Sequence, residues 1–176
     1  MAQLLVISAV GEDRTGIVHD LAQVVLKHEG NILESRMSQL GNEFAMLLLV
    51  SGHWHTVSKL EQALDEFAAT ENLLLTVRAT NEKSAREDRL PYACDLICMD
   101  QGGIVFNVSG FFTARQIEIA ELSTRSYPAA HTGTSMFSIQ ANINVPADIP
   151  IAQLREEFMQ FCDHMNIDGL LEPIKH

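Results

Sequence analysis

The sequence lacks several features that mark large classes of protein. None of its apolar runs approaches the ~20 residues needed to span a bilayer. The N-terminal stretch MAQLLVISAVGEDR has no basic region and reaches an acidic turn early, so no signal peptide is expected. There are only three cysteines, without the spacing of a disulfide framework, which suits a reducing compartment. We therefore expect a cytoplasmic protein that does not interact with membranes.

Positive charge is scarce as well. The 12 Lys and Arg face 23 Asp and Glu, which gives a formal net charge of −11. A surface of this sign repels the phosphate backbone of nucleic acids, so direct nucleic-acid binding is not expected. The rest of the composition, with 47% hydrophobic and 20% charged residues, is ordinary for a globular protein. The length suits one medium domain or two small ones.

No set of catalytic or metal-binding residues emerges. The sequence has no G-x-S-x-G elbow, no dinucleotide-binding glycine pattern and no cysteine beside a basic residue in a turn. Cys94 and Cys98 would share one face of a strand, and with Cys162 they are interpreted as small core residues rather than zinc ligands. His53 and His55 are expected in a solvent-facing loop. We expect neither an enzyme nor a metal or cofactor site.

The first half of the chain alternates between strand-like and helix-like patterns. Strands are predicted over residues 4–9, 32–40, 44–50 and 73–77, with Gly41-Asn42 as the turn of a hairpin. The buried faces of two helices are predicted from helical spacing: Ile17, Leu21, Val24 and Val25 in the first, and Val57, Leu60, Leu64, Phe67 and Ala68 in the second. Ser58 with Glu61 is the expected capping box of the second helix. The order β-α-β-β-α-β predicts two helices on one face of a sheet.

The same pattern then starts again. The polar stretch TNEKSAREDR, residues 80–89, separates the halves. Strands are predicted over 92–99, 118–122, 136–145 and 170–171, with helical faces formed by Val105, Val108, Phe111 and Phe112 and by Ile151, Leu154, Phe158, Phe161 and Met165. A constant offset of 87 aligns the halves without a gap from Val6 to Glu34, which indicates an internal duplication. We expect an α+β protein with domains over 1–80 and 91–176 and a linker over 81–90.

The duplicated segment contains a tight turn that opens a helix. Unpaired backbone N–H groups meet there, with the positive end of the helix dipole behind them. Gly16 would let a ligand approach the backbone, and the carboxylate of an amino acid is an anion of suitable size. Neither copy has the glycines and lysine of a phosphate loop. The alternative is that Asp13 or Thr15 caps the helix and that Gly16 serves packing alone.

The segment GEDRTGIVHDLAQVVLKHEGNI closely resembles the first turn and helix of the ACT domain, a module that binds small molecules. The usual form of that family is D-R-P-G-[IL]-[VL], followed some fifteen residues on by N-I. The first copy departs from it at Thr15, and the second has lost the Arg and the Pro and carries Glu118 in place of Asn31. The resemblance implies two ferredoxin-like βαββαβ units, each a four-stranded antiparallel sheet with two helices on one face. The ligand-binding residues that it implies are Asp13, Arg14, Thr15, Gly16, Ile17, Val18 and Asn31 in the first copy, and Asp100, Gln101, Gly102, Gly103 and Ile104 in the second.

Two such units in tandem resemble the glycine cleavage system transcriptional repressor family. That resemblance implies an amino-acid-sensing transcriptional regulator whose ligand is glycine and whose partner is a DNA-binding transcriptional activator protein. The amino acid is expected where the turn meets a neighbouring unit, with its carboxylate on the N–H groups of Thr15, Gly16 and Ile17 and its ammonium on Asn31 or Asp13.

Three questions stay open at this point. The chain could instead be a detached regulatory subunit for an enzyme of amino-acid or one-carbon metabolism, or an interaction module with a vestigial site. The units could pair within one chain or across a homodimer. The segment 126–135, which includes His131, is an expected insertion between two hairpin strands, and either contacts a partner or is merely tolerated.

Overall fold

The structure is a computed structural model that describes residues 2–82 and 88–174. The chain divides into two compact units, Met1–Ser84 and Ala85–His176. The main part of the predicted linker, residues 83–87, lies outside the described residues, whereas Arg89 and Leu90 already belong to a strand.

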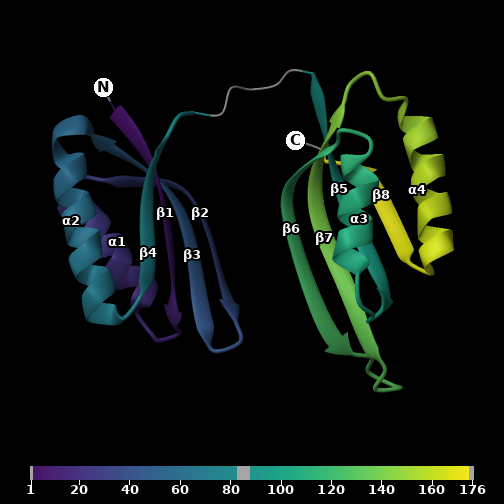
Figure 1. Cartoon of the computed structure of the whole chain (residues 1–176), viewed down its shortest axis with the longest axis horizontal. Helices are drawn as coiled ribbons and strands as arrows, with labels where there is room; N and C mark the ends of the chain where they lie inside the picture. Colours follow the sequence, from purple (N-terminus) through teal and green to yellow (C-terminus); the bar gives the residue numbers. More distant parts are fainter. Residues whose placement is uncertain (1, 83–87, 175–176) are drawn as a thin grey trace. The chain divides into compact units, whose positions relative to one another are not determined.

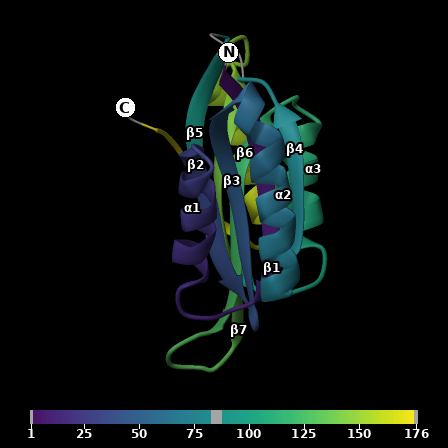
Figure 2. The same ribbon diagram turned by 90° about the vertical axis from the view of Figure 1, so that its left-hand side faces the viewer.

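The N-terminal unit is one antiparallel sheet with two helices on one face (Figure 1). Its elements are β1 (Ala2–Glu12), α1 (Ile17–Lys27), β2 (Asn31–Leu40), β3 (Glu43–His53), α2 (Trp54–Glu71) and β4 (Leu74–Thr80). The strands are ordered β2-β3-β1-β4. Figure 2 views this unit from the side of α1 and α2, which lie side by side in front of the sheet.

The C-terminal unit repeats this architecture. Its elements are β5 (Arg89–Met99), α3 (Ile104–Thr113), β6 (Glu118–Pro128), β7 (Ser135–Pro146), α4 (Ile151–Met165) and β8 (Asp168–Pro173), with strand order β6-β7-β5-β8. Even an irregularity is repeated, because the pairing shifts between Ile32 and Glu34 in β2 and between Ile119 and Glu121 in β6. The predicted α+β class, with two βαββαβ units, is confirmed.

Each unit has its own hydrophobic core between sheet and helices. Alternation along β1 places Leu5, Ile7 and Ala9 on the face toward the helices. From α1, the predicted residues Ile17, Leu21 and Val25 belong to the same core. The C-terminal core is richer in aromatic residues: Phe111 and Phe112 of α3 meet Phe158 of α4 with ring centroids 5.8 and 6.4 Å apart. Each unit therefore buries apolar surface without help from the other.

Two predictions about helices need correction. The capping box is wrong, because α2 begins at Trp54 and its N-cap is His53, so Ser58 lies inside the helix. Val105 does not belong to the buried face of α3, since its side chain is 40% exposed and Ile104 takes the buried place. A pattern of apolar residues predicts that a helix is present more reliably than it predicts which residues of that helix are buried.

Two predictions about loops also need correction. The segment 126–135 is loop only in part, because β6 continues to Pro128 and β7 begins at Ser135, which leaves residues 129–134 between the strands. The remaining loop is closed by a bond from the Ala129 N–H to the Thr134 carbonyl at 2.8 Å, and His131 is exposed within it. His53 and His55 do not lie in a loop either. They stand where β3 passes directly into α2, with their rings stacked at 5.5 Å.

Candidate ligand-binding site

The two glycine turns have nearly the same backbone. Gly16 (φ 92°, ψ −8°) and Gly103 (φ 87°, ψ 1°) are the N-caps of α1 and α3, and both adopt the left-handed conformation that favours glycine. Their carbonyls accept the first helical bonds, from Asp20 N–H at 2.9 Å and Asn107 N–H at 3.0 Å. Since the N-caps are glycines and no side chain caps either helix, Asp13 and Thr15 do not have the capping role considered above.

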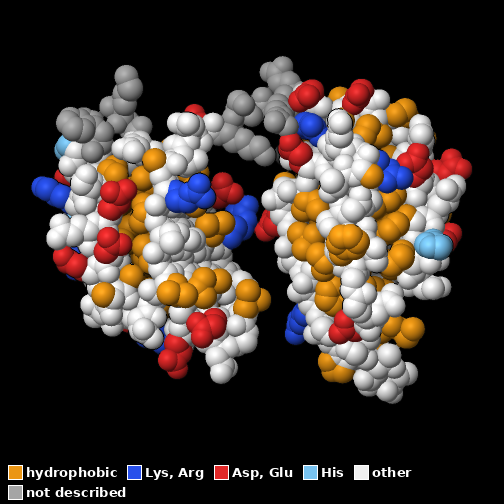
Figure 3. Space-filling model, in the orientation of Figure 1, with side chains coloured by type: hydrophobic (Ala, Val, Ile, Leu, Met, Phe, Trp, Pro, Cys, Tyr) orange, Lys and Arg blue, Asp and Glu red, His pale blue; other side chains and the backbone are white. Residues whose placement is uncertain are grey.

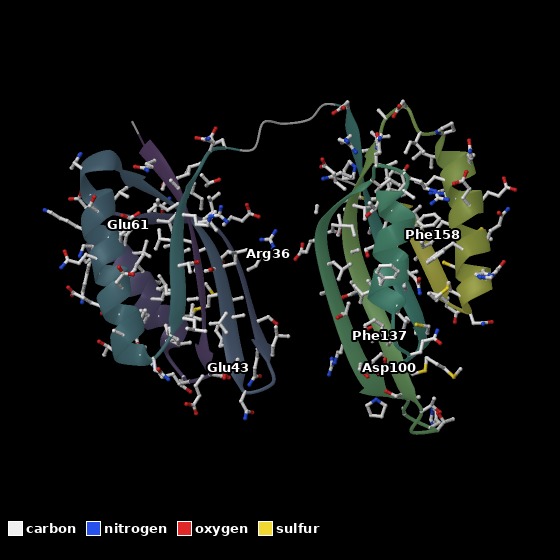
Figure 4. The ribbon with its side chains drawn as sticks, in the orientation of Figure 1. Arg36, Glu43, Glu61, Asp100, Phe137 and Phe158 are labelled. Atoms are coloured by element: carbon white, nitrogen blue, oxygen red, sulfur yellow. The ribbon has the colours of Figure 1, made fainter. Side chains whose placement is uncertain are left out.

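The aspartate of each turn ties it to the neighbouring hairpin. The Asp13 N–H donates to the Asn42 carbonyl at 3.0 Å, and Gln39 Nε2 donates to Asp13 Oδ2 at 2.9 Å. In the second copy the Asp100 N–H donates to the Ser135 carbonyl at 2.9 Å, and Asp100 Oδ2 accepts from Ser126 Oγ at 2.6 Å (Figure 4 labels Asp100). Each aspartate thus fixes the position of a turn between β-hairpin and helix.

Arg14 is held by two carboxylates. Its Nη2 lies 2.7 Å from Asp20 Oδ2 and 2.6 Å from Glu71 Oε2, while Nε donates to Glu71 at 2.8 Å. These hydrogen bonds raise the pKa of the guanidinium, and the one to Asp20 contributes more than the one to Glu71. Asp20 lies in the first turn of α1 and Glu71 at the end of α2, so Arg14 links the ends of both helices.

The second copy has lost this whole charged set. The offset of 87 puts Gln101 at the place of Arg14 and Asn107 at the place of Asp20. The second helix of each unit ends at an asparagine with positive φ, Asn72 or Asn166, so Met165 stands where Glu71 does. The first turn therefore carries two carboxylates against one guanidinium, and the second carries neutral residues at all three places.

The remaining predicted site residues fall into two groups. Thr15, Gln101 and Gly102 are exposed to solvent. Ile17 and Ile104 are only 3% exposed, so their side chains belong to the core. The Ile17 N–H donates to the Arg14 carbonyl at 3.4 Å, a long hydrogen bond that a ligand at this position would replace. Val18 points outward at 38% exposure.

Asn31 lies away from the turn. It pairs with Ser51 in the sheet, and Ser51 pairs with Leu4 near the start of β1, whereas the turn follows the end of β1 at Glu12. Leu4 and Glu12 are separated by roughly 26 Å at about 3.3 Å per residue. Within one unit, therefore, Asn31 cannot contact an amino acid bound at Gly16, and Asp13 is the nearer of the two predicted acceptors for an ammonium group.

Open hollows also lie on the surfaces of the units, and two of them are relevant to a bound amino acid. One of about 450 Å³ adjoins the first turn and is lined by the ends of β1, β3 and α2, including Glu12, Glu43 and Asn72. Another, of about 640 Å³, lies on the sheet face of the C-terminal unit that is not covered by helices, and its lining includes Asp95 and Arg125. The hollow beside the first turn is acidic, which suits the ammonium end of an amino acid better than its carboxylate.

The cysteines are core residues, as predicted. Cys94 is fully buried and Cys98 and Cys162 are 5% exposed. Burial raises the pKa of Cys94 to about 12 and that of Cys162 to about 11. Across residues 2–82 and 88–174, no group of three or more His, Cys, Asp or Glu side chains could hold a metal ion. No helix in these ranges is both long and apolar enough to cross a membrane.

Sequence reasoning missed the partners that hold the turns. Asp20 could have been found, because it lies six residues from Arg14 at the start of a predicted helix. Nothing local pointed to Glu71 or to Gln39, which are brought to the turn by the ends of α2 and β2. Such partners depend on tertiary packing, which hydrophobic periodicity does not encode.

Comparisons with known proteins identify the architecture. A family model described as the ACT domain matches residues 3–78. The chain is 28% identical over 172 residues to the glycine cleavage system transcriptional repressor of Escherichia coli (strain K12), and the alignment covers 98% of this chain and 90% of that protein. The chain is also 33% identical over 79 residues to a UPF0237 protein of Neisseria meningitidis serogroup B, and this alignment covers 44% of this chain and 87% of that protein.

Solved structures agree over the whole length. A crystal structure of a protein described as unknown, from Galdieria sulphuraria, has a TM-score of 0.80 at 27% identity and covers 99% of this chain and 100% of its own. A second crystal structure, described provisionally as a glycine cleavage system transcriptional repressor, has a TM-score of 0.75 at 28% identity, covering 100% and 99%. The N-terminal unit therefore belongs to the ACT-domain family, the C-terminal unit repeats its fold, and the whole chain resembles the glycine cleavage system transcriptional repressors.

Proposed function

We propose that this protein is an amino-acid-sensing transcriptional regulator of the glycine cleavage repressor type. It binds a small amino acid, with glycine as the first choice, and acts through a DNA-binding activator protein. It is not an enzyme. The observation that carries this proposal is the similarity to the Escherichia coli repressor, which extends through both units and not only through the N-terminal one.

The glycine turns are the proposed binding places. The carboxylate of the ligand is bound by backbone N–H groups at the start of the helix, around Thr15, Gly16 and Ile17 in the first copy and around Gly102, Gly103 and Ile104 in the second. Because glycine has no Cβ, this backbone stays uncovered at Gly16. A Cβ there would lie 3.7 Å from Arg14 Nη1, on the side from which we expect the ligand to approach. Asp13 or Asp100 lies beside the turn to accept a hydrogen bond from the ammonium group.

The two proposed ligand sites differ in the charged side chains around them. At the first turn, Asp20 and Glu71 stand close to any bound carboxylate and weaken its binding unless Arg14 turns from them toward the ligand. At the second, Asn107 and Met165 impose no such repulsion. The first site therefore requires a rearranged Arg14, while the second binds with its present side chains.

The experiment is a thermal-shift screen of the twenty amino acids with the full chain. A ligand that binds only the folded state at a hundredfold excess over its Kd adds about 2.7 kcal/mol to the free energy of unfolding. In a chain of this size that raises Tm by several degrees. We expect glycine to give the largest shift. If no amino acid shifts Tm at millimolar concentration, the turns serve only as helix starts and the sensing proposal fails.

Variants then assign the site. Asparagine tolerates positive φ, so Gly16→Asn and Gly103→Asn keep the turn while covering its backbone with a side chain. Gly133→Asn is the matched control, because Gly133 also has positive φ (70°) but lies in the β6–β7 loop with open space around its Cβ position. We expect the glycine-induced shift to vanish in one or both turn variants and to persist in the control.

A binding experiment tests the route to transcription. The full chain, immobilised and exposed to an extract of its own cells with and without glycine, should retain a DNA-binding protein, identified by mass spectrometry. Retention of an enzyme of amino-acid or one-carbon metabolism instead would make the chain a detached regulatory subunit.

A further inference from the structure

The sheet of the C-terminal unit has a second face, which its helices do not cover. Along β5, Cys94, Leu96 and Cys98 are buried toward the helices, so Asp95 and Ile97 between them lie on the other face. Figure 3 shows hydrophobic side chains gathered on the side of this unit that carries α3. The uncovered face carries the hollow of about 640 Å³, whose polar side chains have no part in the proposed function.

This hollow continues into a smaller one on the same face. The second hollow measures about 290 Å³ and shares three lining residues with the first: Asp95, Ser123 and Gln140. Gln140 of β7 pairs with Asp95 of β5 on one side and with Ser123 of β6 on the other, so the three form one row across the sheet. In the next row, Ser138 of β7 pairs with Arg125 of β6. We call the combined hollow over these two rows the sheet trough.

Two opposite charges lie on the two sides of the sheet trough. Asp95 and Arg125 are two strands and one row apart, about 9.6 Å across the sheet and 6.6 Å along it, so their Cα atoms are separated by about 12 Å. Within residues 2–82 and 88–174, no hydrogen bond or ion pair holds either side chain. The sheet trough therefore offers an anion and a cation that are both available to a ligand.

A neutral amide lies between the two charges. A line from Asp95 to Arg125 crosses β7 between Gln140 and Ser138. The Gln140 side chain is exposed and offers a carbonyl acceptor and N–H donors. A peptide group has one N–H and one carbonyl, so it can pair with such an amide in both directions. The middle of the sheet trough thus suits a peptide group better than an apolar linker.

The duplication supplies an internal comparison. At the places of the two charged residues and the glutamine, the first unit carries neither a charge nor an amide. The offset of 87 and the strand pairing identify these places as Ser8, Ser38 and Leu47. The same fold therefore forms without this set of groups, which is specific to the second unit.

We propose that the sheet trough binds a short peptide zwitterion of dipeptide length. Its ammonium group pairs with Asp95, its carboxylate with Arg125, and its peptide group with the Gln140 amide. Two extended residues span roughly 7 Å, and the side chains of Asp95 and Arg125 cover the rest of the distance. A single α-amino acid carries both charges on one carbon and is too short to reach both partners.

The openness of the sheet trough sets the strength of binding. Its charged groups stay in contact with water, so each charged contact is weak and we expect Kd in the millimolar range. Loss of one charged contact should raise Kd about fivefold. This inference goes beyond the proposed function and does not require a ligand at the glycine turns.

Titration of the isotope-labelled full chain with glycylglycine, followed by amide NMR, tests the proposal. Signals around Ser123 and Gln140 should shift and saturate. The matched ligand is δ-aminovalerate, which has the same charged ends separated by the same number of atoms but no peptide group. It should bind about threefold more weakly, because it cannot pair with the Gln140 amide.

Variants of the chain test the two charges. Asp95→Ser and Arg125→Ser introduce the serines that the first unit carries, and each should raise Kd for glycylglycine about fivefold. The matched control is Arg78→Ser, because Arg78 is an exposed arginine on β4 of the N-terminal unit. It should leave Kd unchanged. The amide spectrum of each variant shows directly whether the chain is folded.

Three results would overturn the proposal. The first is the absence of any shift at tens of millimolar glycylglycine, and the second is equal affinity for δ-aminovalerate or for either serine variant of the sheet trough. The third is a response confined to residues 13–18 and 100–104, which would mean that glycylglycine acts as an amino acid at the glycine turns. That third result would leave the proposed function intact, so the two proposals fail separately.

Discussion

At the residue scale, Arg14 with its two carboxylates shows how local charge depends on distant segments. The D-R-x-G pattern was visible in the sequence, and it led to the expectation that Arg14 is available to a ligand. In the structure Asp20 and Glu71 hold this guanidinium at 2.7 and 2.6 Å. The glycine of the pattern could be predicted because its backbone requirement is local, whereas Glu71 is 57 residues away in sequence.

Replacing Arg14 by the residue of the second copy tests whether the three charges act together. Arg14→Gln leaves Asp20 and Glu71 facing each other without a cation, so Tm should fall, and the effect should shrink at high salt. Adding Asp20→Asn and Glu71→Met removes the repulsion between the carboxylates, so Tm should rise most of the way back to that of the wild type. A triple variant that melts no higher than Arg14→Gln would mean that the carboxylates are independent.

The buried thiols predict how the protein responds to alkaline pH. Burial raises the pKa of Cys94 to about 12 and that of Cys162 to about 11, from 9.0 in an unfolded chain. The folded state holds these protons more tightly, so the free energy of unfolding falls as pH rises above 9 toward 11–12. Denaturant titrations between pH 7 and 10.5 should show this loss, and Cys94→Ala combined with Cys162→Ala should reduce it.

At the element scale, periodicity predicted which elements exist but not where they end. The eight strands and four helices of residues 2–82 and 88–174 are all predicted in the right order, because alternation and helical spacing are properties of the chain itself. The ends of the strands depend on how the strands pair. The pairs Tyr127↔Met136 and Pro128↔Ser135 lengthen β6 and β7 into a segment whose composition indicates a loop. The start of α2 at Trp54 likewise follows from the strand that leads into it.

The contact between β8 and α4 gives a sharp test of packing. A Cβ at Gly169 would lie 2.5 Å from Cys162 Sγ, 2.9 Å from Leu96 Cδ2 and 3.0 Å from Phe158 Cε1. Gly169→Ala should therefore lower the free energy of unfolding by about 1–3 kcal/mol, as overpacked cores do. The control is Gly102→Ala, where nothing lies within 4 Å and φ is not positive. Equal denaturation midpoints for the two variants would contradict the packing described for β8.

At the scale of the whole molecule, the duplication was predictable and the different fates of its halves were not. The offset of 87 shows the repeat, and both halves rebuild the same sheet order around separate cores. That Arg14 and Asp20 share a third charged partner, Glu71, whereas Met165 takes the equivalent place in the second unit, follows only when the ends of α2 and α4 are compared.

The charge of the whole chain predicts its behaviour toward DNA. With 12 Lys and Arg against 23 Asp and Glu, few phosphate contacts can form, so the isolated protein should not shift duplex DNA at moderate salt. A gel-shift assay with promoter DNA checks this. A sequence-specific shift by the protein alone would contradict a route that runs through an activator.

The charged set around Arg14, which the second unit lacks, also limits the order in which mutations can accumulate after a gene duplicates. From a set like Arg14, Asp20 and Glu71, losing the arginine first leaves two acids in mutual repulsion, whereas losing one acid first leaves a paired remainder. Side chains that are 25–39% exposed make each step small but not neutral. The less destabilising order therefore replaces one carboxylate first, and then Arg14 together with the remaining carboxylate. The effect of each substitution on stability depends on which of the others has already occurred. Substitutions at Arg14, Asp20 and Glu71 are therefore coupled, and so are the steps that would convert this set into the Gln, Asn and Met of the second unit.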